Sequence, residues 1–324
     1  MEFLDKIESI KTMSIDGFSV IFLRGPISYS EDIIILREAV DKDLVEISEV
    51  SEGGSVNQLK FENRSNKFIV GFRGDILIGC KQNRFLFTTI IIPPESVNNI
   101  PVSCVEQGRW SWQTEKMKQE RRIPYLINAV NISFEANVGD RQALRESGSI
   151  EIIQHEVWGA IMSRMQRLSV KSLTSNIVEI IEKKIKGAKI DVPEGANGVV
   201  ILYDRKVIGG EIFFLKVDKS YIEQSVIAAY FDYEYYKKAK IKIESDISEL
   251  DQLLKEITKC SIKKREGILS EDVVSLKSDK IVGFLTMLNN KPVHMEFVVP
   301  INIEKHDEYF KNIVQRMDNI MSAL

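Results

Sequence analysis

The chain has 324 residues and a formal net charge of −3. Hydrophobic residues make up 44% of it and charged residues 28%, a composition typical of globular proteins and unlike that of disordered chains. Without a basic surplus, the chain is unsuited to general nucleic-acid binding, which requires many neutralised phosphates. The length favours two domains or one elaborate domain.

The N-terminal sequence MEFLDKIESIKTMSIDG carries charges every few residues, so we expect no signal peptide. We find no run of about 18 apolar residues, the length needed to span a bilayer, and therefore expect no membrane association. Three cysteines without a C-x-x-C pair indicate neither a disulfide framework nor a zinc site. The sequence predicts a cytoplasmic protein with no metal and no cofactor.

The first 110 residues are predicted to be rich in strands. β-Branched and aromatic residues dominate short runs that are separated by Gly, Asn, Ser and Pro. Several short strands with regular turns are typical of a sandwich or barrel-like sheet. We expect a short helical turn within 30–43 and strands at 18–24, 44–49, 56–62, 67–72, 75–78, 84–92 and 98–106.

Residues 111–148 are polar and weakly periodic, and we expect a long excursion there with one or two short strands. From Ser149 onwards apolar residues recur at helical spacing, which predicts a helix that begins at this residue. A second helix is expected at 174–186, with Thr174 or Ser175 as its N-cap.

The last third is predicted to be a second α+β unit. Hairpins are expected at 198–214 and 281–300, and helices at 218–238, 246–258 and 304–321. The predicted fold is thus α+β, with a β-rich sandwich or barrel-like domain at 1–148. Residues 149–324 would form a helical and α+β portion that packs on it, either separately or as one continuous domain.

Two stretches, 74–84 and 100–110, concentrate polar residues between apolar strands. If a strand runs through Glu106, Cys104 lies on the same face, and a bend at Gly108 would bring the next two residues to that edge.

Arg109 and Trp110 would complete a set of groups suited to a nucleotide. An arginine can bind phosphate, a tryptophan can stack on a base, and the Glu106 carboxylate can bind ribose hydroxyls. The alternative is that Glu106 and Arg109 form a structural ion pair while Trp110 fills the core.

Spacing and motif content argue against several mechanisms. Neither Cys80 nor Cys104 has the arginine spacing of a phosphatase loop, and there is no Walker loop, G-x-S-x-G elbow or G-x-G-x-x-G. A nucleophilic Cys-His pair is left only for Cys104 with one of three scattered histidines, which we expect to be structural or exposed. Gly53-Gly54 is either a plain turn or a phosphate-cradling one.

Several of these segments together resemble a known family. They are GDILIGCKQNR at 74–84, IPVSCVEQGRW at 100–110, QHEVW at 154–158 and NGVVILYDRKVIGGEIF at 197–213. The chain resembles the prokaryotic ADP-ribosylglycohydrolase-and-rhodanese-phosphatase-associated protein family, first type. Cys80 departs from the pattern, since it stands where the family is expected to have a second glycine.

The resemblance implies an association with ADP-ribose and NAD-derived metabolites. It leads us to expect that the protein binds or processes a small nucleotide-type ligand, with enzymatic activity and homo-oligomerisation left open. The candidate catalytic residues are Glu106 and Cys104. The candidate ligand-binding residues are Glu52, Asp75, Gln82, Arg84, Arg109, Trp110 and Gln154.

Two other functions compete with nucleotide binding. One is a non-enzymatic scaffold or protein-interaction module, in which the polar cluster is structural. The other is hydrolysis of a different phosphorylated sugar.

Overall fold

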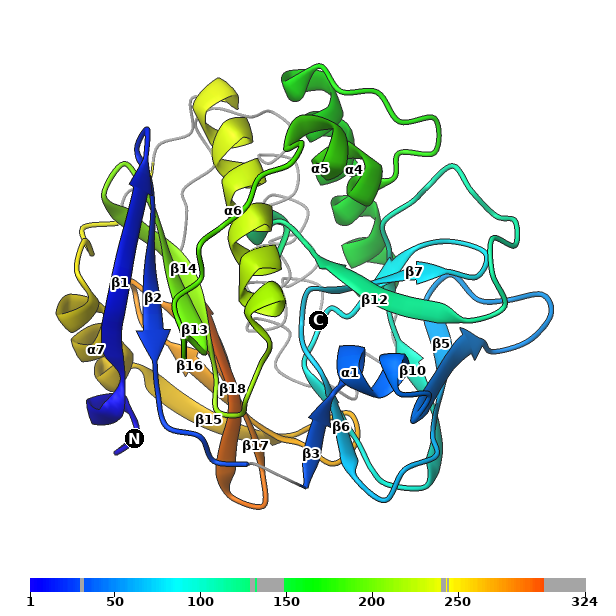
Figure 1. Ribbon diagram of the computed structural model, residues 1–324, viewed down its shortest axis with the longest axis horizontal. Coiled ribbons are helices and arrows are strands. Elements are labelled where there is room, and N and C mark those ends of the chain that lie inside the picture. Colours follow the sequence, from blue (N-terminus) through cyan, green and yellow to red (C-terminus); the bar gives the residue numbers. More distant parts are fainter. Residues whose placement is uncertain (30–31, 129–131, 133–148, 240–242, 244, 300–324) are drawn as a thin grey trace.

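A computed structural model describes residues 1–29, 32–128, 132, 149–239, 243 and 245–299. Its largest element is an antiparallel sheet of eight strands in the order β1-β2-β13-β14-β18-β17-β16-β15 (Figure 1). The strands are β1 (Glu8–Ile15), β2 (Phe18–Arg24), β13 (Gly198–Tyr203), β14 (Lys206–Phe213), β15 (Ser261–Glu266), β16 (Asp272–Lys277), β17 (Val282–Leu288) and β18 (Lys291–Val298).

Three small sheets lie beside the large one, on the right in Figure 1. Their strand orders are β10-β5-β4, β11-β8-β7-β12 and β3-β6-β9. The strands are β3 (Ile33–Ile35), β4 (Val45–Glu49), β5 (Gln58–Asn63), β6 (Phe68–Gly71), β7 (Asp75–Gly79), β8 (Arg84–Phe85), β9 (Ile90–Ile92), β10 (Ser96–Pro101), β11 (Ser103–Cys104) and β12 (Met117–Arg122).

The helices cover both faces of the large sheet. They are η1 (Leu4–Lys6), α1 (Leu36–Asp41), α4 (Ser149–Leu168), α5 (Ile177–Lys184), α6 (Lys219–Ala239) and α7 (Leu250–Lys259). The apolar side of α7 packs against one face, where Leu253 and Ile257 join a core with Val200 and Phe214. On the other face α6 runs between the large sheet and the small sheets (Figure 1). None of the described helices is long and apolar enough to cross a membrane.

The α6 helix is the centre of the main core. Its buried residues fall on most of its circumference, which is the pattern of a helix enclosed by other elements. Tyr221, Ile222 and Val226 pack with strand residues such as Phe18 and Val199. The helix begins near the predicted Asp218, whose carboxylate accepts a hydrogen bond from Ser220 N at 2.7 Å.

The α+β class and the strand-rich N-terminal half are confirmed. Strand β2 and the hairpin β13–β14 have the predicted bounds to within one residue, as does the start of α4. The hairpin turn is set locally, because Asp204 and Arg205 both adopt positive φ, at 48° and 65°.

Two long predicted strands are each divided between two sheets. Residues 84–92 form β8, which pairs with β7, and β9, which pairs with β6. Residues 98–106 likewise give β10 in one sheet and β11 in another. Apolar continuity predicted single strands, but the backbone bends at Phe87 and Thr88, and Val102 separates β10 from β11.

Other boundaries differ for local reasons. The N-cap of α5 is Asn176, whose side chain accepts from Val178 N, because the Thr174 hydroxyl donates to Glu106. The helix predicted at 246–258 begins only at Leu250. Strands β1, β3, β15 and β16 had no predicted counterpart. The predicted helix at 304–321 and much of the excursion at 111–148 lie outside the described residues, although β12 occupies 117–122.

The first strands of the chain belong to the same sheet as its last third. Strand β2 pairs with β13 over its length, from Leu23 opposite Gly198 to Phe18 opposite Tyr203. The large sheet therefore contains strands from both sides of residue 148, the predicted boundary between the two portions. Whether those portions fold independently stays a prediction.

Candidate functional site

Six polar residues from the resembling segments meet in one place, which we call the motif cluster: Gln82, Arg84, Cys104, Glu106, Arg109 and Gln154. The turn after β7 supplies Gln82, β8 supplies Arg84, β11 and the loop after it supply the next three, and α4 supplies Gln154. Hydrogen bonds link the segments directly, as Gln82 Nε2 donates to Glu106 O at 3.1 Å. The structure therefore brings these six predicted residues together, and their role as a ligand site stays a prediction.

The turn that holds the cluster contains a strained position. Cys80 has a φ of 44°, in the left-handed region that glycine adopts most readily. Its thiol is buried in the core of the small sheets, and its carbonyl accepts a hydrogen bond from Arg109 Nη1 at 2.7 Å. The backbone thus takes a glycine-like conformation even though cysteine stands there.

The Glu106 carboxylate is engaged on both oxygens. Oε2 accepts from Arg109 Nε at 2.9 Å and from Asn83 N at 3.2 Å, while Oε1 accepts from the Thr174 hydroxyl at 2.9 Å. The side chain is 5% exposed. These contacts satisfy the carboxylate without a ligand and favour a structural role over an acid/base role.

Arg109 is equally committed to the protein. Besides the ion pair with Glu106, at 2.7 Å, its guanidinium donates to the carbonyls of Cys80 and Ser111 and to Asn83 Oδ1. All of these groups hold the loop against the turn that follows β7. This arrangement is that of the structural ion pair, the alternative that the sequence left open.

Arg84 is fully buried but incompletely bonded. Its Nε donates to Val56 O at 2.8 Å and its Nη2 to Ser55 O at 3.2 Å, whereas Nη1 has no hydrogen-bond partner among the described residues. Within the same part of the chain, Gln82 Oε1, also buried, lacks a partner as well. Burial lowers the pKa of the Arg84 guanidinium, since water no longer solvates its charge.

Cys104 and Gln154 form a closed contact. Gln154 Oε1 accepts from Cys104 N at 2.6 Å, and its Nε2 donates to Cys104 O at 2.8 Å. The side-chain amide of Gln154 thus connects α4 to β11 by two hydrogen bonds. Burial raises the pKa of the Cys104 thiol despite the nearby Arg84 charge. A raised pKa leaves little thiolate, which is the opposite of what a nucleophilic cysteine needs.

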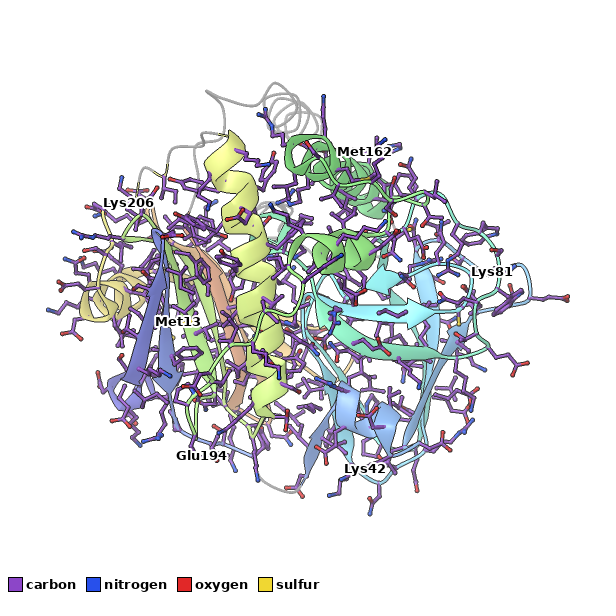
Figure 2. All side chains as sticks on the ribbon, turned by 45° about the horizontal axis from the view of Figure 1, so that its top comes forward. Met13, Lys42, Lys81, Met162, Glu194 and Lys206 are labelled. Carbon is purple, nitrogen blue, oxygen red and sulfur yellow. The ribbon has the colours of Figure 1, made fainter. Side chains whose placement is uncertain are left out.

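Trp110 lies at the surface rather than in the core. It is 45% exposed and Trp112 is 50% exposed. The Lys81 ammonium lies 5.6 Å and 5.3 Å from the two ring centroids, and the Arg84 guanidinium lies 5.5 Å from that of Trp110. We call Lys81, Trp110 and Trp112 the aromatic face; Figure 2 shows Lys81 at the outer edge of the small sheets.

The loop before β5 completes this face. Lys81 Nζ donates to the carbonyls of Glu52, at 2.6 Å, and Gly53, at 3.0 Å. Gly54 has a φ of 75°, and a Cβ there would lie 3.2 Å from Lys81 Cδ and 3.3 Å from Trp110 Cζ2. Gly54 is thus closely packed against the aromatic face, and Glu52, whose carbonyl accepts from Lys81, is exposed in the same loop.

Asp75 lies elsewhere, in what we call the central charge network with Arg122, Glu211, Tyr221 and His294. Its carboxylate accepts from Arg122 Nη1 at 2.8 Å and from the Tyr221 hydroxyl, while Arg122 Nη2 lies 2.5 Å from Glu211. His294 Nε2 follows at 3.3 Å from Glu211. The structure therefore separates Asp75 from the other predicted site residues.

Sequence reasoning missed this network and a neighbouring ion pair. Arg73 Nε donates to Glu296 Oε1 at 2.6 Å, and both side chains are buried. The available signal was a lone carboxylate inside an apolar strand, as in GGEIFF around Glu211 and HMEFVV around Glu296. Such residues need a buried cation, which Arg122 at the end of β12 and Arg73 in the loop after β6 supply.

Burial and the ion pairs act in opposite directions on the carboxylates. Burial raises the pKa of Asp75 in spite of Arg122, whereas for Glu211 the attraction of Arg122 and His294 outweighs burial and lowers the pKa. In the part of the chain that the structure describes, no group of three or more His, Cys, Asp or Glu side chains is placed to hold a metal ion.

Comparison with known proteins identifies a family and nothing finer. Neither the curated proteins nor the solved structures contain a significant match to the chain. A family model does match, over residues 6–298, and this range contains the motif cluster, the aromatic face and the central charge network. The chain therefore belongs to the ARG and Rhodanese-Phosphatase-superfamily-associated Protein domain family.

Proposed function

We propose that the protein binds an ADP-ribose-type or other NAD-derived nucleotide at the aromatic face. The observation that carries the proposal is the exposure of Trp110 and Trp112 beside the Lys81 ammonium. A nucleotide combines a flat base with anionic phosphates, and an indole next to a cation offers a partner for each.

The motif cluster would serve this face as its foundation. Arg109 and Glu106 hold the loop that ends in Trp110, and Arg84 lies beneath the Trp110 ring. In this proposal Trp110 stacks on the base, Lys81 binds phosphate and the exposed Glu52 carboxylate accepts from ribose hydroxyls.

Binding is favoured over chemical conversion of the ligand. The two candidate catalytic groups are the ones most fully engaged within the protein, because Glu106 is bonded on both oxygens and Cys104 is buried with a raised pKa. A sensor or carrier of the nucleotide needs neither group to react.

The test is a titration of the protein with ADP-ribose, NAD and AMP, followed by calorimetry and by mass spectrometry of the ligand. Trp110→Ala should raise the Kd about 5- to 150-fold, the equivalent of about 1–3 kcal/mol for one stacked base. Trp110→Phe, the matched control, keeps a ring and should lose much less. Binding that is equal in both variants would refute stacking on Trp110, and an altered ligand mass would establish an enzyme.

A protein-interaction module is the second candidate, and one observation favours it. Leu173 is fully exposed and lies next to the loop that carries Trp110, and Met162, which is 50% exposed, accepts a hydrogen bond from the nearby Ser175 hydroxyl. Gly108 marks the contact, because a Cβ there would lie 2.8 Å from Thr174 Cα. Light scattering separates the two candidates. The interaction module is supported if the protein is an oligomer that Leu173→Ser dissociates and if it binds none of the three nucleotides.

A further inference from the structure

A groove of about 590 Å³ is lined by residues of α1, β12, α5 and α6 and of the segments beside them, and it shares no residue with the aromatic face. Its volume is within the range of about 300–1,000 Å³ that is usual for small-ligand sites. Five cationic side chains line it, against two carboxylates, Glu182 and Glu223. The cations are Arg37 from α1, Arg121 and Arg122 from the end of β12, and Lys186 and Lys189 from the segment after α5.

Two of these cations are already neutralised. Arg121 Nη2 lies 2.9 Å from Glu182 Oε1, and Arg122 belongs to the central charge network with Asp75 and Glu211. The Glu223 carboxylate accepts from Ile190 N at 3.0 Å.

Arg37, Lys186 and Lys189 are different, since no ion pair engages them within the described residues. Arg37 Nη1 donates only to the Ser220 hydroxyl, at 2.9 Å. Even with the Glu223 carboxylate counted, the cations without an ion pair outnumber the carboxylates without one in the groove, which favours an anion.

Gln224 adds a second requirement. Its side chain lines the groove, is 7% exposed, and its buried Oε1 has no hydrogen-bond partner among the described residues. A buried acceptor without a partner costs free energy, and rotation of this amide toward the groove would let a donor on a bound ligand remove that cost. A hydroxyl is the common donor that is compatible with surrounding cations, because it carries no positive charge.

The remaining wall is apolar and is formed by Ile181, Ile185, Ile227 and two alanines. Such a wall suits the C–H surface of a carbon skeleton. We propose that this groove is a binding site for a phosphorylated sugar or polyol. The phosphate lies against Arg37 and Lys189, and a hydroxyl donates to Gln224. The site is additional to the proposed nucleotide site, since the two share no residue.

The probe is ribose 5-phosphate, titrated calorimetrically into the full-length protein beside inorganic phosphate and ribose. Ribose 5-phosphate should bind at least about tenfold more tightly than inorganic phosphate, because it satisfies Gln224 as well as the cations. Ribose alone should not bind at millimolar concentration, since it lacks the charge. Equal affinity for the two phosphates would overturn the role given to the hydroxyl.

Matched variants locate the site. Lys189→Gln and Arg37→Gln should each weaken ribose 5-phosphate binding about tenfold. Lys263→Gln removes the same charge from β15 and should change nothing. Gln224→Leu should lower the affinity for ribose 5-phosphate to that for inorganic phosphate and should keep the wild-type Tm, because it removes an unpartnered buried group.

Three results would overturn the proposal. The first is no binding of ribose 5-phosphate, and the second is an equal loss of ribose 5-phosphate affinity in Lys189→Gln and Lys263→Gln. The third is loss of ribose 5-phosphate binding in Trp110→Ala, which would place the sugar phosphate on the aromatic face instead. Trp110→Ala is expected to lose ADP-ribose and keep ribose 5-phosphate, so failure of the nucleotide proposal and failure of this one give different patterns.

Discussion

The ion pair between Arg109 and Glu106 offers the sharpest test of what the motif cluster does. Arg109→Ala would remove a cation that is 13% exposed and leave the 5% exposed Glu106 carboxylate with only neutral partners. Removing one partner of a buried pair typically costs about 3–5 kcal/mol. At about 2 °C per kcal/mol for a chain of this size, the Tm should fall by roughly 6–10 °C.

Calorimetry and far-UV circular dichroism would measure this loss. Arg64→Ala is the control, since Arg64 pairs with Glu46 and Glu62 at the surface and is 42% exposed, so its Tm should change little. Arg109→Met combined with Glu106→Gln should recover part of the loss, because no uncompensated charge is left in the protein.

One result would refute the structural account of this pair. If Arg109→Ala kept the wild-type Tm but lost ADP-ribose binding, the guanidinium would be a ligand group rather than a brace. The carbonyls of Cys80 and Ser111, which Arg109 also bonds, would then have to be satisfied by water.

Three further predictions concern other parts of the molecule. Asn176→Ala should lower the unfolding free energy by about 1 kcal/mol in urea titrations, through loss of the α5 cap, whereas Ser175→Ala should not. Burial raises the pKa of Cys80 to about 11. At pH 8 its thiolate should therefore be roughly a hundredfold scarcer than that of an ordinary cysteine, and a thiol reagent should label it only after unfolding. Arg164→Met should cost about 3–5 kcal/mol at pH 7, because it strands Asp232. Burial already raises the pKa of Asp232. Without Arg164, the Asp232 carboxylate would take up a proton more readily still. The loss of unfolding free energy should therefore shrink as the pH falls toward the unfolded pKa of about 4. A loss that grew as the pH fell would contradict this account.

The sequence determined the elements whose cause is local. The hairpin β13–β14 was predictable because two apolar strands flank a dipeptide that accepts positive φ, and α4 because its apolar residues recur at helical spacing. The sequence also showed which polar residues belong together, since the segments around Gln82 and Glu106 are adjacent strands and turns.

Only the tertiary structure decided which sheet each strand joins. Strand β2 pairs with β13 across some 175 residues of sequence, and the apolar run at 84–92 is divided because its ends have partners in different sheets. The apolar pattern of a strand shows that its faces are buried, but it does not identify the elements that bury them.

The roles of the candidate residues were decided at the same level. Arg109 and Trp110 are neighbours in sequence, yet their environments differ. The Arg109 guanidinium is bonded to other protein groups, whereas Trp110 is 45% exposed. Asp75 lies in the central charge network with Arg122 and Glu211 rather than in the predicted site. The cations that line the groove come from three separate segments of the chain. The physical reason is that hydrogen bonding and desolvation depend on every group within a few ångströms, and most of those groups are distant along the chain.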